Sequence, residues 1–119
     1  MEAVMKSNMD AVISHHLSAF GDADLEEIMK DYTDESQLFT PEGALQGRSS
    51  IRGFFTTVFK MIPKGSSFEI KQKFVSDEIA YIAWSCESEC VNIPLGTDSF
   101  IITDNKIAIQ TLAAHIISK

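Results

Sequence analysis

The sequence has few basic residues, and they form no cluster. Its 119 residues include 10 Lys and Arg against 17 Asp and Glu, a formal net charge of −7. Proteins that bind nucleic acid neutralise phosphates with lysine and arginine, so no nucleic-acid partner is expected. Seven acidic residues and one lysine lie between Asp22 and Glu35. That pattern favours a solvated, N-terminally capped helix over an acidic docking surface.

Long hydrophobic runs are also absent. No stretch approaches the ~18 apolar residues of a membrane span, and no basic segment followed by an apolar run opens the sequence. We therefore expect no membrane contact and a cytoplasmic protein. Cys86 and Cys90 fall four positions apart in a predicted strand, roughly 13 Å, which excludes a mutual disulfide or a shared metal. Both are expected to be small buried residues in a reducing compartment.

Three segments have the apolar periodicity of helices. Residues 4–20 place apolar side chains at three- and four-residue spacing and end at Gly21, and one member of this apolar stripe is His16. A second, short helix is predicted from a capping box at Asp24 to about Tyr32. The strongest periodicity begins after Ser49 or Ser50 and continues to residue 62.

Five segments have the character of strands. The first is 36–40, followed by a turn at 41–43, and the others are 68–74, 79–91, 97–103 and 106–117, with 92–96 as a loop. The last strand is apolar on both faces near its end, which indicates that both faces are covered. The helices would cover one face and a second subunit the other, so we predict a homodimer through the outer face of the sheet.

Three segments have a specific pattern: DYTDES, FTPEG and GRSSIRGFF, which begin at Asp31, Phe39 and Gly47. On these segments the sequence resembles the nuclear transport factor two-like superfamily, and most closely its SnoaL-like and ketosteroid-isomerase-like branches. The resemblance spans nearly the whole chain and implies one α+β domain over residues 1–119. Three N-terminal helices would pack on a strongly curved antiparallel sheet, a cone-shaped half-barrel with an internal pocket for a small apolar or polycyclic molecule.

The same resemblance suggests site residues. The isomerase branch places its proton-shuttling carboxylate where this chain has Thr40, so ordinary ketosteroid isomerisation is not expected. A tyrosine of that branch is replaced by His16, whereas a strand aspartate is kept as Asp98. An aspartic acid kept neutral by a dry, apolar site can donate a hydrogen bond to an oxyanion. His16 and Asp98 are thus the candidate catalytic residues, and Asp98 has the alternative of a surface ion pair at a hairpin edge.

The pocket walls are expected to be mainly apolar and aromatic. Trp84 would form a wall for a flat ligand, because its strand face lines the cavity in similar proteins. No cofactor or metal motif is present, and His15 is expected at the surface, about 100° around the helix from His16. The face that His115 occupies is left open. The full set of candidate ligand-binding residues is Tyr32, Thr40, Phe55, Phe59, Ile82, Trp84 and Cys86.

Two functions remain open at this stage. The protein binds a small apolar or polycyclic metabolite and performs cofactor-independent isomerase, cyclase or hydrolase chemistry by acid–base catalysis at His16 and Asp98. Alternatively, it is a noncatalytic ligand-binding or dimeric protein-interaction module, in which His16 is a core histidine bonded to a backbone carbonyl. The fold supports many unrelated activities, so the sequence does not choose between them.

Overall fold

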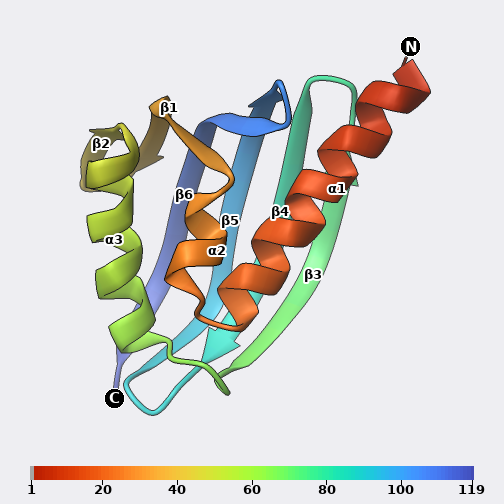
Figure 1. The fold of residues 1–119 in the computed structure, drawn as a ribbon. Helices are drawn as coiled ribbons and strands as arrows, with labels where there is room; N and C mark the ends of the chain where they lie inside the picture. Colours follow the sequence, from red (N-terminus) through yellow and green to blue (C-terminus); the bar gives the residue numbers. More distant parts are fainter. Residues whose placement is uncertain (1) are drawn as a thin grey trace.

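The computed structural model describes the backbone of residues 2–119 and the side chains of residues 8–119. Three helices lie on one side of a curved, unclosed sheet of six strands (Figure 1). The α+β architecture expected from the sequence is therefore confirmed. In chain order the elements are α1 (Glu2–Gly21), α2 (Leu25–Met29), β1 (Tyr32–Thr40), β2 (Gly43–Gln46), α3 (Arg48–Met61), β3 (Ser67–Val75), β4 (Ile79–Glu87), β5 (Val91–Thr103) and β6 (Lys106–Ser118).

The strand order of the sheet is β2-β1-β6-β5-β4-β3. Strands β3 to β6 form an antiparallel meander, as expected. The expectation of a wholly antiparallel sheet is wrong for one pair, because β1 runs parallel to β6, with Leu38 opposite Gln110. The pairing starts where the Ile107 amide donates to the Asp31 carbonyl at 2.7 Å. It places the turn after α2 directly against the sheet.

The second helix is shorter than predicted, and an additional short strand, β2, follows β1. Helix α2 does begin at its cap, where the Glu27 amide donates to Asp24 Oδ1 at 3.1 Å. It ends at Met29, so Tyr32 begins β1 rather than ending a helix. Strand β2 was not predicted, since its four residues are mostly exposed and show no alternation.

The predicted strand 79–91 is interrupted by a turn at residues 88–90. Ser88 Oγ accepts from the amides of Cys90 and Val91, both at 3.1 Å, and donates to the Met61 carbonyl at 2.6 Å. A serine side chain therefore makes this turn without glycine or proline. The predicted loop 92–96 belongs to β5. Cys90 is exposed in the turn, so its predicted burial is wrong, whereas Cys86 is buried.

The hydrophobic core lies between the helices and the inner face of the sheet. Helix α1 contributes Met9, Val12, Ile13 and Ala19, and α3 contributes Ile51 and Phe55. These are the apolar stripes that the helical periodicity marked. None of the helices in the described chain is both long enough and apolar enough to cross a bilayer.

Candidate functional site

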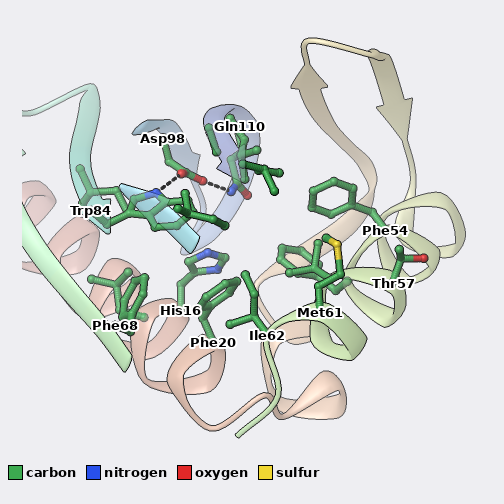
Figure 2. Close-up of a pocket in the computed structure, with 18 of the residues that line it drawn as sticks. His16, Phe20, Phe54, Thr57, Met61, Ile62, Phe68, Trp84, Asp98 and Gln110 are labelled. Atoms are coloured by element: carbon green, nitrogen blue, oxygen red, sulfur yellow. Dashed lines mark hydrogen bonds between the residues drawn. The ribbon is translucent and has the colours of Figure 1, made fainter. Parts of the chain in front are cut away.

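A pocket of about 180 Å³ lies between α1, α3 and the inner face of the sheet (Figure 2). Most of its lining is aliphatic or aromatic, and exposed residues such as Glu42 and Thr57 stand at its edge. Its buried polar side chains are His16, Asp98 and Gln110. A hollow of this kind, apolar with a few polar groups, is the usual form of a small-molecule site. The remaining lining residues are Leu17, Phe20, Phe54, Phe55, Val58, Met61, Ile62, Phe68, Ile82, Trp84, Ile93, Leu112, Ala114 and Ile116.

Of the nine candidate residues, the structure brings His16, Phe55, Ile82, Trp84 and Asp98 to this pocket. The other four lie outside its lining. Tyr32 is buried in the core, with its ring against that of His16. Thr40 donates its hydroxyl to the Gly43 carbonyl at 3.0 Å, and Phe59 packs on Phe20 and Phe55. Cys86 is buried and lies opposite Phe68 in the neighbouring strand.

Asp98 accepts two buried hydrogen bonds. Trp84 Nε1 donates to Oδ1 and Gln110 Nε2 donates to Oδ2, both at 2.7 Å. The Tyr32 hydroxyl in turn donates to Gln110 Oε1. Figure 2 shows Asp98 between Trp84 and Gln110. With Tyr32 bound to Gln110, four side chains from β1, β4, β5 and β6 form one connected polar network. Asp98 is therefore no surface ion pair.

Burial raises the pKa of Asp98 from 3.8 to about 6, and the two N–H donors oppose the rise. The carboxyl is therefore mainly ionised at neutral pH. Desolvation favours the neutral acid, but hydrogen bonds that point at the carboxylate favour the charged form. The sequence-based expectation of a protonated donor applies only below about pH 6.

Gln110 is a buried member of this network that the sequence did not single out. It is fully buried and connects Asp98 to Tyr32, which is 78 positions away in the chain. The available signal was one amide residue, followed by a single threonine, in the mainly apolar run Ile107–Leu112. A buried amide needs partners on both its nitrogen and its oxygen. The partners lie on other strands, so the sequence did not identify them.

Trp84 depends on a glycine in the neighbouring strand. Trp84 pairs with Gly96 across β4 and β5, and a Cβ at Gly96 would lie 2.3 Å from Cζ2 of the indole. Real Cβ atoms do not approach so closely, so the ring lies against bare backbone. The absence of a side chain at Gly96 allows the indole nitrogen to reach Asp98.

His16 lies within the aromatic core beside the pocket. Its ring makes edge contacts with Tyr32, Phe55 and Phe100, with centroid distances of 5.3 to 6.2 Å. Desolvation lowers its pKa to about 3, so the imidazole is neutral. Nδ1 is buried without a hydrogen-bond partner and lies 3.9 Å from Asp31 Oδ2, which is too long for a hydrogen bond. The core histidine bonded to a backbone carbonyl is thus not observed.

His15 is partly exposed, as expected for a surface position, and it is paired with two carboxylates. Its Nδ1 lies 2.8 Å from Asp31 Oδ1 and its Nε2 lies 2.8 Å from Glu27 Oε1. These hydrogen bonds raise the His15 pKa. His115 is exposed, opposite Leu95. Within the described side chains, no group of three or more His, Cys, Asp or Glu residues is arranged to hold a metal ion.

The solved structures most usefully compared with this chain share its fold at low sequence identity. A candidate ketosteroid isomerase from Kribbella flavida DSM 17836 is 11% identical over 92% of this chain and 79% of its own, with a TM-score of 0.76. A SnoaL-like protein of unknown function from Burkholderia thailandensis E264 is 17% identical over 94% and 96%, with a TM-score of 0.72. AclR, a candidate hydroxylase from Streptomyces galilaeus, is 11% identical over 92% and 90%, with a TM-score of 0.75.

No protein with a curated description matches the sequence significantly. The sequence pattern of the SnoaL-like domain matches residues 13–110, which include both His16 and Asp98 and end at Gln110. The chain therefore belongs to the SnoaL-like domain family, and its fold is that of the nuclear transport factor two-like proteins.

Proposed function

We propose that this protein binds a small, mainly apolar ring compound in its pocket, and that Asp98 acts on the ligand as a proton acceptor without a cofactor. One observation carries the proposal: Asp98 and Gln110 are hydrogen-bonded to each other in a pocket that His16 also lines and whose other buried walls are aliphatic and aromatic. Such a site fixes the orientation of a ligand through its polar group and excludes water from it.

The size of the pocket limits the ligand. An apolar protein cavity of ~150 Å³ accommodates benzene, whereas drug-sized ligands occupy roughly 300 Å³ or more. At about 180 Å³ this pocket suits a single ring with small substituents. A polycyclic molecule would have to extend past the exposed edge at Glu42 and Thr57.

The electrostatics favour Asp98 over His16 as the base. General bases are most effective when their pKa lies near the working pH. The pKa of Asp98 is about 6, whereas that of His16 is about 3. We assign His16 the role of a neutral hydrogen-bonding partner for the ligand, and Asp98 that of the base in isomerase, cyclase or hydrolase chemistry.

Binding is tested by titrating small ring compounds and following the indole N–H resonance of Trp84, the only tryptophan. Thr57 and Thr56 provide matched variants, since both are exposed on α3 and both hydroxyls donate to the carbonyl four residues earlier. Only Thr57 lines the pocket. Thr57→Phe should weaken binding by about tenfold by obstructing the entrance, whereas Thr56→Phe should not. Equal effects of the two variants would refute binding in this pocket.

Noncatalytic binding is the second candidate function. It is favoured by one observation: both oxygens of Asp98 already accept hydrogen bonds, so a ligand proton must compete with Trp84 and Gln110. The two functions differ in turnover. If a compound that binds is converted, Asp98→Asn should abolish conversion because the amide has no basic oxygen, whereas binding should only weaken, by about tenfold, because the charged acceptor is lost. A bound compound that is recovered unchanged supports the noncatalytic role.

We further infer that the chain forms a homodimer through the outer face of its sheet. Side chains alternate between the two faces of a strand, and the paired residues Leu38 and Gln110 are buried on the inner face. The residues on either side of them therefore point to the outer face, where the strand pairing aligns them in two neighbouring rows. Neither row contains a charged side chain, and a chain of net charge −7 can approach a second copy of itself most easily there. The rows are Phe39, Thr111, Ser99, Tyr81 and Phe74, and Gln37, Ile109, Ile101 and Ile79.

The dimer is tested by measuring molar mass with light scattering after size exclusion. Ile101 is 40% exposed although it is a large apolar residue at the middle of its row. Ile101→Lys should convert a dimer to a monomer, because it would bury an unpaired charge at the interface. Thr56→Lys on the exposed face of α3 serves as the control. A monomeric mass for the unmodified protein would refute the inference.

A further inference from the structure

The donors at the polar end of the pocket are already used within the protein. The Trp84 indole N–H donates to Asp98, and the Tyr32 hydroxyl donates to Gln110. Gln110 Nε2 donates to Asp98, and its side chain has no exposed surface, so a ligand does not reach the second amide hydrogen. What this network leaves for a ligand is the lone pairs of the Asp98 carboxylate.

His16 is the remaining polar group, and its tautomer decides whether it donates or accepts. Asp31 Oδ2 lies 3.9 Å from Nδ1, the nitrogen that has no hydrogen-bond partner. If Nδ1 were unprotonated, its lone pair would face a carboxylate. With the proton on Nδ1, the N–H dipole points toward that carboxylate, which is favourable in a site with little water. The lone pair then belongs to Nε2, on the ring edge that remains to face the pocket.

The charge of Asp31 is held in place by His15. Both nitrogens of His15 lie within 2.8 Å of a carboxylate oxygen, one on Asp31 and one on Glu27, so both carry a proton. The resulting imidazolium fixes Asp31, which is only 6% exposed. Burial raises the Asp31 pKa, and the hydrogen bonds from His15 oppose that rise. Asp31 is too far from His16 Nδ1 to form a hydrogen bond. It is therefore a positioning residue, whose charge sets the position of the proton on the His16 ring.

We propose that the polar end of the pocket consists of hydrogen-bond acceptors only, Asp98 and His16 Nε2, and that it selects a ring compound bearing a hydroxyl group. This inference rests on the proposed binding function. A phenolic or alcoholic hydroxyl donates to these acceptors, whereas a ketone or aldehyde finds no free donor. A carboxylate would in addition meet the negative charge of Asp98, and a buried group without a partner is strongly disfavoured.

The tautomer of His16 is tested in the free protein by nitrogen-15 NMR of the imidazole rings. We expect Nδ1 of His16 to be protonated and Nε2 to be unprotonated, the reverse of the form that free histidine prefers. Asp31→Asn should return His16 to the Nε2–H form, because the carboxylate charge is lost. Glu27→Gln is the matched control: it removes the other carboxylate beside His15 and should leave His16 unchanged. An Nε2–H tautomer in the unmodified protein would overturn the proposal.

The ligand class is tested with four single-ring compounds of similar size: phenol, toluene, benzaldehyde and benzoate. Phenol should bind about tenfold more tightly than toluene, the gain from one hydrogen bond to a charged acceptor. Benzaldehyde should bind no more tightly than toluene, and benzoate should bind most weakly. Toluene binding as tightly as phenol would overturn the selectivity but leave the binding function intact. If none of the four binds, the proposed function fails as well, while the His16 tautomer remains a separate result.

A change of pH provides the same test without a substitution. At about pH 5, below the Asp98 pKa of about 6, the protonated carboxyl becomes a donor and the preference for phenol over benzaldehyde should fall. The titratable groups beside Asp98 do not change charge in this range, because the pKa of His16 is about 3 and that of Tyr32 is well above its ordinary value. A preference that is constant across this range would show that Asp98 does not contact the ligand.

Discussion

Replacing Asp98 with asparagine should remove a specific part of the pH dependence of stability. The pKa of Asp98 is about 6 in the folded protein against an ordinary value of 3.8, so the folded state binds this proton more tightly than the unfolded state. The resulting stabilisation is fully present below about pH 4 and is lost as the pH rises through 6. At 1.36 kcal/mol for each pH unit, the difference amounts to about 3 kcal/mol.

The measurement is the free energy of unfolding in urea, followed by Trp84 fluorescence between about pH 4 and pH 7. The quantity of interest is the stability of the unmodified protein minus that of Asp98→Asn, which should fall by about 2.4 kcal/mol over this range. Glu26 and Glu27, whose pKa values are lowered by Arg52 and His15 respectively, respond in the opposite direction. They are present in both proteins and cancel. A difference that is flat, or that rises with pH, would refute the assignment of a raised pKa to Asp98.

Two further substitutions, one of them with a matched control, test the packing around the network. Gly96→Ala should destabilise the protein by about 1–3 kcal/mol in thermal or urea unfolding, because the new Cβ would overlap the Trp84 ring. It should also shift the indole resonance of Trp84. The control is Gly53→Ala on α3, where a Cβ would meet open space; it should stabilise the protein by up to about 1 kcal/mol. An equal response of the two glycines would contradict the close approach. Tyr32→Phe should cost about 1–3 kcal/mol, measured by urea unfolding, because it leaves Gln110 Oε1 buried without a donor. A neutral effect would show that the amide finds another partner.

The fold could be predicted from the sequence wherever one face of an element is buried. The apolar stripes of α1 and α3 each record a single buried face, and both helices were located to within a few residues. Strand β3 was located equally well, although a register shift between Ile70 and Gln72 leaves Phe74 exposed. Elements whose burial leaves no periodic pattern in the sequence were not predicted. Strand β2 is exposed on both sides, and the turn after β4 depends on hydrogen bonds that Ser88 Oγ accepts from the amides of Cys90 and Val91 rather than on glycine or proline. The parallel pairing of β1 with β6 depends on the whole chain.

Only some of the site residues could be identified from the sequence. His16 is conspicuous because it is polar within an apolar stripe, and Asp98 was identified through the family resemblance. The importance of Gln110 and Asp31 comes from their partners, and these lie on different elements. Spacing along one helix or strand does not identify such pairs. The geometry of the folded chain does.

The position of β6 between β1 and β5 also has a consequence for how the chain folds. Strand β1 obtains its parallel neighbour only when residues about 70 positions later have been placed, since Tyr32 lies opposite Ile107. Closing so long a segment costs chain entropy before any pairing energy is gained. The β3–β5 meander involves local pairings and should form first, leaving β1 to dock late. A folding intermediate of this kind would have an ordered Trp84 beside a pocket that has not yet formed.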